Sequence, residues 1–552
     1  METSQILALD TETNFTDQLN ERHLLGLAIT TDCDTYYIPV GHKSFMGSKT
    51  NNIEIPQDFF VGLTAPIVAH NMKFDYQVLT RHGIKVPTDN LWCTMLMSVY
   101  IDETNKGVNS GHGLEVVLPK YLGTEKKKVV EASALKKFGW ENSPPEYMAI
   151  YAEQDCRPLP LLYQTLRPKL SAALIKQWEE VDRDFMLCLG ELEDLGIPID
   201  RELCEKLDYQ CLRRMEEIRR ELGFDPAKPS QLHPKLFSDP PFGLGLKPSS
   251  LTPGGKPQVS LEWLQRVGHP TTALVYEYRK TAKQQSSYFS AYLRLTTREY
   301  ARLHCNFKQH GTETGRLSCE LPNLQQIPRD EYKDARVKEV FLPEQGKQLW
   351  EIDFRTIEYR LQAVYAADHR LIDLFENEQD FHQLVADDIS SKLGGKFDRQ
   401  RAKTVNYLMS FGGGKQVLAK QLGVSVGIAA SIHSAYKASY PLIFDKALEA
   451  QHAAEANDLE VPMWNGRVRH FRYPSECHKA FNAVIQGGAF EIVKRAMLKL
   501  RASGFTMSNQ VHDSVWLNVD SERDVIDAQQ IMSGWTKDFF GLTFSTDRKR
   551  LK

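Results

Sequence analysis

The sequence lacks long hydrophobic runs, paired cysteines and a strong imbalance of charge. In its 552 residues no uninterrupted apolar stretch reaches transmembrane length, and no signal-peptide pattern follows Met1. The nine cysteines are scattered without a Cys-x-x-Cys pair, which disfavours disulfides and zinc and favours reduced thiols in a cytosolic compartment. The net charge of −3 neither supports nor excludes DNA as a partner, because a local positive channel is enough to attract phosphates. With 42% apolar and 25% charged residues, the composition is that of a soluble globular chain with several cores.

Residues 349–363 predict a strand that turns into a helix, with an acidic side chain at the bend. The first five positions are apolar or alternate, whereas Ile357 and Leu361 recur at helical spacing, so the period changes just after Asp353. Glu358, in the first helical turn, can point back toward the same pocket. A lone Asp at a strand end is more often a helix N-cap than a metal ligand, and this stretch alone leaves both interpretations open.

A second acidic side chain stands at a predicted turn within residues 508–519. This run alternates between apolar and polar positions and predicts a β-hairpin with His512 and Asp513 at its turn. Carboxylates on neighbouring strand ends suit Mg²⁺, which takes oxygen ligands and keeps positions for phosphates and water. We therefore predict that Asp353 and Asp513 form a metal-binding pair.

Residues 399–414 predict a helix that ends at three glycines. Arg399, Lys403, Tyr407 and Phe411 recur every four residues, so two cations and two aromatic rings form one stripe. A nucleoside triphosphate could lie along such a helix, with its phosphates on the cations and its sugar and base on the rings. The alternative is an amphipathic helix with a solvated basic end and a buried aromatic end.

The N-terminal part of the chain contains four carboxylates and a tyrosine in suggestive positions. Asp10 and Glu12 lie two apart on a predicted strand, so both side chains leave the same face. Asp75 falls in a predicted helix, and Tyr151 and Asp155 share one face of another. Clustered carboxylates can bind two metal ions that activate water for phosphodiester hydrolysis. Taken singly, each motif is more often a solvated strand edge or an ordinary helix pair.

Together these stretches resemble the motifs of the family A DNA polymerases, which include DNA polymerase I and bacteriophage replicative enzymes. Residues 349–363, 399–414 and 508–519 look like that family's motifs A, B and C, in the family's order. Residues 312–318 and 322–328 are similar to its primer-template contact segment, and residues 481–488 to its template and minor-groove contacts. The N-terminal carboxylates resemble the DEDD 3′-5′ exonucleases of the subclass with a tyrosine in the third motif.

The resemblance implies a role for each matching side chain. At a polymerase site, two Mg²⁺ ions would be held by Asp353, the backbone carbonyl of Phe354 and Asp513. At an exonuclease site, where Tyr151 would orient the attacking water, two Mg²⁺ ions would be held by Asp10, Glu12, Asp75 and Asp155. Mn²⁺ is the alternative ion at both sites. The nucleotide would be bound by Arg399, Lys403, Tyr407, Phe411, His382 and Glu358, and DNA by Arg316, Asn482, Gln486, His512 and Asn71. The resemblance also implies that Lys403 protonates the leaving group.

The sequence departs from the family's pattern in motif A, which reads Asp-Phe-Arg-Thr-Ile-Glu where the family usually has Asp-Tyr-Ser-Gln-Ile-Glu, and at Ser514 and Phe411. Ser514 follows Asp513 where the family commonly has a glutamate, which weakens the case for a third carboxylate there, and Phe411 replaces a usual tyrosine. Tyr407 occupies a position that is Phe or Tyr within the family. In the family, a tyrosine hydroxyl at this position lies where a missing 3′-hydroxyl would be felt, so we expect ready use of dideoxynucleotides.

The expected fold class is multidomain, α/β and α+β: a ribonuclease H-like exonuclease domain followed by a right-hand polymerase. The expected divisions are exonuclease 1–170, thumb 171–300, palm 301–370 and 479–552, and fingers 371–478. No 5′-nuclease domain is expected ahead of the acidic pair that begins with Asp10. Residues 225–257 are rich in Pro, Gly and Ser and are expected to form an ordered loop.

The function implied by the resemblance is template-directed DNA synthesis by two-metal phosphoryl transfer, with 3′-5′ proofreading, in phage or viral replication. The implied partners are primer-template DNA and dNTPs, and the chain is expected to be a monomer without membrane association, in the cytoplasm of a bacterium or an infected host. The sequence does not indicate whether a helicase-primase or a single-strand binding protein joins it. Two alternatives are an exonuclease whose C-terminal half only binds DNA, and a single-subunit RNA polymerase. The first is disfavoured by the retention of Asp353, Glu358, Arg399, Lys403 and Asp513, and the second by Glu358 and the proofreading motifs.

Overall fold

The structure is a computed structural model that describes residues 6–14, 16, 22–31, 34–43, 51–105, 111–124, 132–252, 254–328, 336–410 and 412–552. The chain forms two compact units. The first comprises Met1–Leu195, Asn306–Glu320 and Lys347–Arg550. The second comprises Gly196–Cys305, Leu321–Gly346 and Leu551–Lys552.

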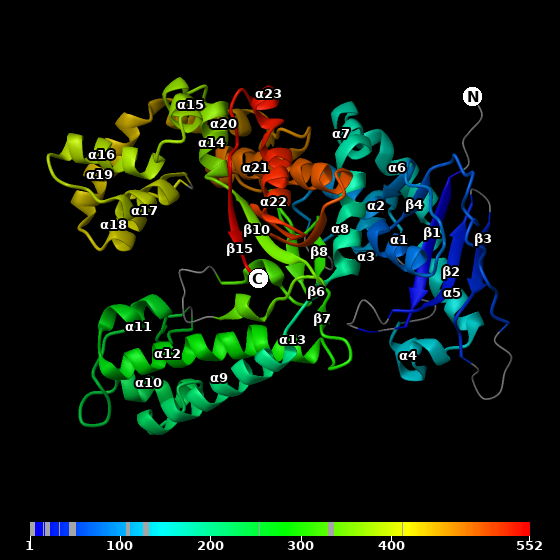
Figure 1. Cartoon of the computed structure of the whole chain (residues 1–552), viewed down its shortest axis with the longest axis horizontal. Coiled ribbons are helices and arrows are strands. Elements are labelled where there is room, and N and C mark those ends of the chain that lie inside the picture. The colour runs from blue at the N-terminus through cyan, green and yellow to red at the C-terminus, as the bar shows by residue number, and fades with distance from the viewer. Residues whose placement is uncertain are drawn as a thin grey trace. The chain divides into compact units, whose positions relative to one another are not determined.

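The N-terminal part of the first unit is built on a five-stranded sheet of order β3-β2-β1-β4-β5 (Figure 1). Its strands are β1 (Leu7–Thr13), β2 (Leu24–Thr30), β3 (Thr35–Pro39), β4 (Ile67–Ala69) and β5 (Leu91–Cys93). The first three strands are antiparallel, whereas β4 and β5 run parallel to β1. Every residue of β2 is buried, as expected for the centre of a sheet covered on both faces. This arrangement confirms the α/β prediction for the N-terminal part.

The helices of this part pack against the sheet or against neighbouring helices and turns. They are α1 (Met72–Arg81), α2 (Thr94–Ile101), α3 (Leu114–Leu122), α4 (Ala132–Phe138), α5 (Pro145–Cys156), α6 (Leu159–Leu166), α7 (Ala172–Gln177) and α8 (Arg183–Leu195). A π-helical turn, η5 (Trp178–Asp182), joins α7 to α8. Helix α5 lies against β1, β2 and β3, so it can bring side chains to the acidic residues of β1.

The C-terminal part of the first unit contains a four-stranded sheet of order β13-β14-β10-β15. Its strands are β10 (Gln348–Phe354), β13 (Thr506–Val511), β14 (Ser514–Val519) and β15 (Thr546–Arg550), and all neighbours are antiparallel. The helices that accompany it are α14 (Ile357–Tyr365), α21 (Ala480–Ala502), α22 (Glu522–Ser533) and α23 (Thr536–Phe540). All six residues of β14 are buried, because α22 packs against the sheet. The expected α+β class of the C-terminal part is thereby confirmed.

A helical segment separates the two halves of this sheet in sequence. Its helices are α15 (His369–Glu376), α16 (Phe381–Leu393), α17 (Arg399–Ser410), α18 (Lys415–Leu422), α19 (Val426–Ser439) and α20 (Pro441–Ala456). Figure 1 shows α16, α17, α18 and α19 as one cluster, and α16 packs against both α17 and α19. Two short hairpins complete the unit: β8 (Asn306–Lys308) with β9 (Ser318–Glu320), and β11 (Glu460–Pro462) with β12 (Val468–His470).

The second unit is mostly helical. It contains α9 (Arg201–Leu222), α10 (Pro229–Phe237), α11 (Leu261–Val267), α12 (Pro270–Gln284) and α13 (Ser290–Arg294), with the short strands β6 (Ile197–Pro198) and β7 (Arg302–Leu303). Helix α9 begins at its N-cap Asp200, whose carboxylate accepts from the Leu203 amide, and packs along α12.

The prediction of a loop over residues 225–257 was wrong in part, because residues 229–237 form α10. Proline at the first helical position suits a helix start. Leu232 and Leu236 then pack into a small core with Trp263 and Val275. The burial of these apolar side chains outweighs the loop-forming composition around them.

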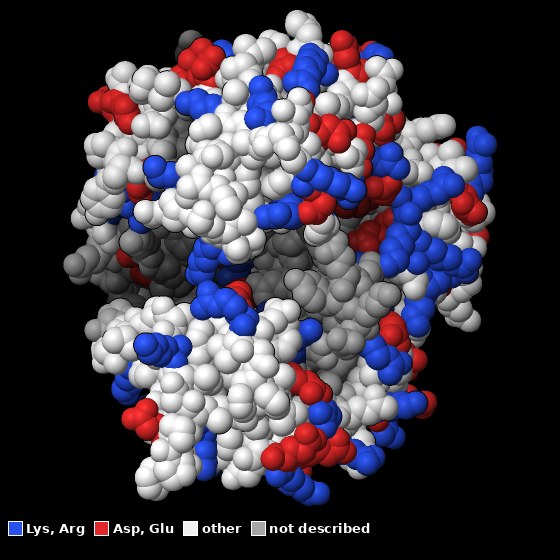
Figure 2. All heavy atoms as spheres, turned by 90° about the vertical axis from the view of Figure 1, so that its left-hand side faces the viewer, with Lys and Arg blue, Asp and Glu red and all other residues white. Residues whose placement is uncertain are grey.

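No helix in the described ranges is long and apolar enough to cross a membrane. On the face that Figure 2 displays, Lys and Arg side chains are mixed with Asp and Glu, in keeping with a net charge of −3.

Candidate active sites

Asp353 lies on β10, and Asp513 lies in the turn that leads into the neighbouring strand β14. In the register between β10 and β14, Asp353 stands opposite Ser514, and the Phe354 amide donates to the Asp513 carbonyl at 3.2 Å. The following helix, α14, has Thr356 as its N-cap residue, with φ of 46° and no side-chain cap. Asp353 is therefore not a helix cap, and its exposed carboxylate can share a site with Asp513.

An arginine joins this pair to the neighbouring glutamate. The Arg316 guanidinium donates to Glu358 and lies 3.7 Å from the Asp513 carboxylate. Burial raises the pKa of Glu358; the charge of Arg316 opposes that rise and the charge of Asp513 adds to it. One cation thus stands between the acidic groups of α14 and the β13–β14 turn, and its single charge does not balance both.

Ser514 is a buried member of the sheet. Its hydroxyl donates to Glu351 at 3.2 Å and to the Val511 carbonyl at 3.0 Å, and only 3% of the residue is exposed. On the other side of Asp353, Asp547 of β15 is held by Arg355 at 2.5 Å. At the position where the family commonly has a glutamate, this chain therefore has a serine whose hydroxyl is hydrogen-bonded within the sheet.

The residues predicted to bind a triphosphate lie along α17 and the start of α16. Arg399 donates to Asp380 at 2.5 Å, and Nδ1 of His382 lies 2.7 Å from the Asn406 side-chain amide. The pKa of His382 is lowered, first by burial and then by the charge of Arg399, so the imidazole is neutral at pH 7.

Lys403 and Tyr407 follow Arg399 on the same helix, as predicted, and Tyr407 is 61% exposed. Phe411 lies outside the described residues. Arg399, Lys403 and Tyr407 therefore lie on the side of α17 that is not buried in the helical cluster.

The predicted DNA contacts of α21 are two half-exposed positions on an otherwise buried helix. Asn482 and Gln486 are one turn apart, and the residues between them are buried. Gly487 and Gly488 follow, and a Cβ at either position would collide with Met463 or Leu361. This close packing fixes the rotation of α21. His512, exposed in the turn before Asp513, has a φ of 54°.

Four side chains predicted for an exonuclease site line a single cavity of about 310 Å³ in the N-terminal part. They are Asp10, Glu12, Tyr151 and Asp155. Asp75 is 2% exposed and accepts hydrogen bonds at 2.8 Å from both the amide and the hydroxyl of Thr11. Strand β1 and helices α1 and α5 therefore bring together residues that are far apart in sequence.

The ionisation of this group reflects burial first and, at Asp10 and Tyr151, the charges of neighbouring carboxylates second. The pKa of Asp10 is raised well above its usual value, first by burial and then by the charges of Glu12, Asp75 and Asp155. Burial raises the pKa of Asp75 to about 7, against the hydrogen bonds from Thr11, and burial together with the nearby carboxylates raises the pKa of Tyr151. Divalent cations would relieve the repulsion among these carboxylates, so the donor set fits oxygen-preferring ions.

The sequence alone did not reveal several residues of this cavity. Phe74, Trp140 and Arg22 also line it, and the Arg22 guanidinium lies 5.2 Å from the centre of the Phe74 ring. Phe74 directly precedes Asp75, so its place in the sequence could have indicated that it lines this cavity. Arg22 and Trp140 carry no such signal, because their proximity depends on the fold.

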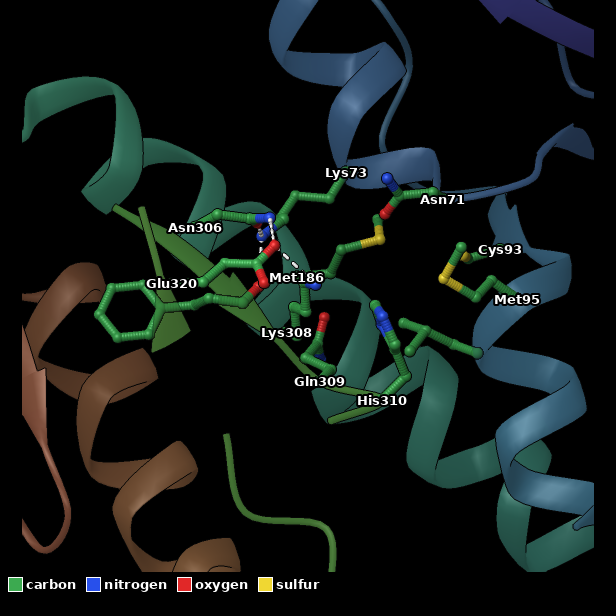
Figure 3. Close-up of a pocket in the computed structure, with 12 residues that line it drawn as sticks. Asn71, Lys73, Cys93, Met95, Met186, Asn306, Lys308, Gln309, His310 and Glu320 are labelled. Carbon is green, nitrogen blue, oxygen red and sulfur yellow. Dashed lines mark hydrogen bonds and ion pairs between the residues drawn. The ribbon is translucent and has the colours of Figure 1, made fainter. Parts of the chain in front are cut away.

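Asn71 lines a second cavity of about 90 Å³ in the same unit and is not one of the residues that line the acidic cavity. Figure 3 shows Asn71 and His310 extending into it from different elements. Lys73 borders this cavity and donates to Glu193, to Asn306 at 3.2 Å and to the Phe307 carbonyl. The start of α1 is thus tied to the β8–β9 hairpin.

The fold and the two acidic sites define the class: an exonuclease-type α/β domain joined to a polymerase-type sheet with inserted helices. The model of DNA polymerase family A matches residues 201–535, and the model of the 3′-5′ exonuclease matches residues 1–171. The chain belongs to DNA polymerase family A.

Individual relatives agree with this assignment. DNA polymerase I of Rhizobium leguminosarum is 27% identical over 96% of this chain and 56% of its own length. DNA polymerase DpoZ of Salmonella phage PMBT28 is 25% identical over 94% of this chain and 89% of its own. The POL domain of Pol1 from M. smegmatis, solved in complex with a DNA primer-template and dNTP, has a TM-score of 0.81 at 20% identity, over 99% of this chain and 95% of that one. The chain spans about half the length of the bacterial relatives it matches.

Proposed function

We propose that the chain is a DNA-directed DNA polymerase that extends a primer 3′ end and removes mismatched ends by 3′-5′ hydrolysis, in phage or viral replication. The observation that carries the proposal is that one family A chain contains two separate acidic sites, one around Asp353 and Asp513 and one around Asp10 and Asp155. We infer the division predicted from the sequence: exonuclease 1–170, thumb 171–300, palm 301–370 and 479–552, and fingers 371–478.

Each site would work through its carboxylates. Asp353, the Phe354 carbonyl and Asp513 at one site, and the four N-terminal carboxylates at the other, would hold Mg²⁺, or Mn²⁺ in its place. When bound, this ion lowers the pKa of the attacking hydroxyl or water and stabilises the leaving oxygen. At the second site Tyr151 would orient the attacking water.

In the polymerase reaction, the cations of α17 would position the triphosphate. Arg399, Lys403 and the neutral His382 would bind its phosphates, and Lys403 would protonate the departing pyrophosphate. Tyr407 and Phe411 would face the sugar and base. Contacts with the primer-template would come from Arg316, Asn482, Gln486, His512 and, for the strand in the exonuclease site, Asn71.

We infer that primer-template DNA and dNTPs are the partners and that the enzyme acts as a monomer in the cytoplasm of a bacterium or infected host. The test is a labelled primer annealed to a longer template with Mg²⁺, incubated with and without the four dNTPs. We expect extension with dNTPs and shortening without them. A primer that shortens under both conditions and is never extended would instead make the C-terminal half a DNA-binding platform.

Glu358 is expected to exclude ribonucleotides. Its carboxylate is held by Arg316 beside Asp513, and we infer that it presses where a 2′-hydroxyl would lie. Replacing Glu358 with alanine should lower the ratio of kcat/KM for dNTP over rNTP by about 10- to 100-fold, the effect of one or two polar contacts.

The ratio would be measured by single-nucleotide extension with matched dNTP and rNTP. Glu358→Gln keeps the volume and should keep most of the discrimination. Glu455→Ala, which removes an exposed carboxylate of α20, serves as the control and should change nothing. An unaltered ratio in Glu358→Ala removes this residue from sugar selection.

Tyr407 is expected to make dideoxynucleotides good substrates. Its exposed hydroxyl can replace the contact that the missing 3′-hydroxyl would make with a phosphate. Tyr407→Phe should therefore reduce incorporation of ddNTP relative to dNTP by about 10- to 100-fold, the value of one hydrogen bond to a charged group. Competition between ddTTP and dTTP on one template measures the ratio, and a wild-type enzyme that already strongly rejects ddTTP would contradict the expectation.

A further inference from the structure

Two buried arginines, Arg467 just before β12 and Arg469 within it, lie between the end of α2 and the turn that carries Arg316. Arg469 is 5% exposed, and its guanidinium donates to Glu103 at 2.8 Å and, through its other terminal nitrogen, to Glu313. Glu103 follows α2 in the N-terminal part, and Glu313 belongs to the turn of residues 312–316. Arg469 thus bridges two acidic residues from elements that are distant in sequence.

Glu103 is fully engaged by donors from β12. Besides Arg469, it accepts from the His470 amide at 2.7 Å and from His470 Nδ1 at 2.8 Å. Burial alone would raise the pKa of Glu103, but the hydrogen bonds from His470 and Arg469 outweigh it and lower the pKa. Glu103 is therefore a charged, buried anchor for both residues.

The same residues could be considered a metal site, since ligand atoms of Asp102, Glu103 and His470 lie within 4.8 Å of one another. Lys120, however, donates to Asp102 at 2.7 Å, and Arg469 donates to Glu103. Two cations already neutralise the carboxylates, so a metal ion would have to displace them. The group is an ion-pair junction.

Arg467, which directly precedes this strand, makes a second contact with the same turn. Arg467 is 4% exposed, and its guanidinium lies 5.6 Å from the centre of the Tyr100 ring of α2. Gly315 has a φ of 83°, and a Cβ there would collide with this guanidinium. Only glycine allows this approach, so the turn is packed directly beneath Arg467.

The turn ends at the arginine of the polymerase site. The Thr312 hydroxyl donates to the Arg316 carbonyl at 2.6 Å, which closes the turn. From there the Arg316 side chain reaches Glu358 and lies 3.7 Å from Asp513. A shift of the turn would move this guanidinium away from the acidic groups.

We propose that Glu103 is a positioning residue for the polymerase site, because through Arg469 and Glu313 it holds the turn of residues 312–316 where Arg316 meets Glu358 and Asp513. This inference rests on the proposed function. It makes the end of α2, within the segment matched by the exonuclease model, a structural part of the polymerase site. It further implies that the loss of this contact affects synthesis and leaves hydrolysis intact.

The test compares Glu103→Gln and Glu313→Gln with a matched control. Both substitutions keep the size of the side chain and remove its charge, and Glu313 is half-exposed, so that variant folds even if the buried one does not. Glu191→Gln is the control: its carboxylate pairs with Arg501 of α21 and so also links the N-terminal part to a helix beside the C-terminal sheet, but not to the turn.

We expect kcat for primer extension to fall by about 10-fold in both variants, since small displacements of a positioned group are costly. The KM for dNTP, the rate of hydrolysis of single-stranded DNA and the melting temperature should stay near wild type, and Glu191→Gln should match wild type throughout. Because Glu313 acts through Arg316, Glu313→Gln combined with Arg316→Ala should lose no more than Arg316→Ala alone.

Extension within twofold of wild type in both variants would overturn the proposal, as would losses that add in the double variant. Equal decreases in extension, hydrolysis and melting temperature would also overturn it, because they indicate a general structural role. A wild-type chain that does not extend primers refutes the proposed function itself. Wild-type extension with unaffected variants refutes only the positioning role.

Discussion

Replacing Asp353 with alanine is expected to lower primer extension by about 10³- to 10⁴-fold and to leave 3′-5′ hydrolysis within twofold of wild type. Asp353 on β10 pairs with Ser514, the residue after Asp513, so the two carboxylates stand side by side and we expect neither to hold a divalent cation firmly without the other. Losing a metal ligand removes several kcal/mol of stabilisation of the charge that develops on the oxygens. Single-turnover extension with a saturating dNTP measures the effect.

The sheet offers a matched control for this experiment. Asp547 stands directly opposite Asp353 on β15, but Arg355 already pairs with it, and its side chain is 61% exposed. Asp547→Asn should therefore extend primers at nearly the wild-type rate. If Asp547→Asn extends primers as slowly as Asp353→Ala, the lower rate results from disturbing the edge of the sheet rather than from losing a metal-binding carboxylate. If Asp353→Ala extends normally, the polymerase site lies elsewhere.

Replacing Asp10 with alanine is expected to have the opposite selectivity. Hydrolysis of a single-stranded oligonucleotide should fall by about 10³-fold or more, because Asp10 is the residue that the other three carboxylates surround. Extension of a matched primer should stay within twofold. Release of labelled mononucleotides measures the first rate, and gel analysis of the primer measures the second.

Glu153→Gln is the control for Asp10→Ala. Glu153 lies on α5, two residues before Asp155, but it pairs with Arg157 at 3.4 Å and is not among the residues that line the acidic cavity. Its loss should leave hydrolysis unchanged. A substantial residual hydrolysis in Asp10→Ala would contradict the two-metal assignment at this site.

The parts of the molecule that sequence could predict are those set by local period and by motif. The change of period after Asp353 locates the end of β10, and alternation places Asp513 at a turn between β13 and β14. The spacing in residues 399–414 gives one helix with Arg399, Lys403 and Tyr407 on it. The resemblance to the family then indicates which strand ends meet, which local pattern cannot do.

What sequence could not predict are contacts between residues that are far apart and carry no motif. Asn406 beside His382, Thr11 beside Asp75 and Glu103 beside Arg469 all depend on tertiary packing. The last pair is separated by 366 positions. The helix α10 is a further example, because its stability comes from burial against Trp263 rather than from its own proline-rich sequence.

The strand and loop from Arg467 to Arg472 carry a consequence for work with truncated forms. Arg467 rests on Tyr100, Arg469 on Glu103, and Arg472 donates to the Thr104 carbonyl, so each arginine has a partner at the end of α2. A fragment trimmed of its N-terminal segment would lack these partners for all three guanidinium groups at once and would leave Arg469 with its contact to Glu313. Such a fragment would bind nucleic acid non-specifically and with a steeper dependence on salt than the whole chain. Its DNA binding would then reflect newly exposed charge as well as missing proofreading. The two halves of this chain therefore cannot be treated as independent modules.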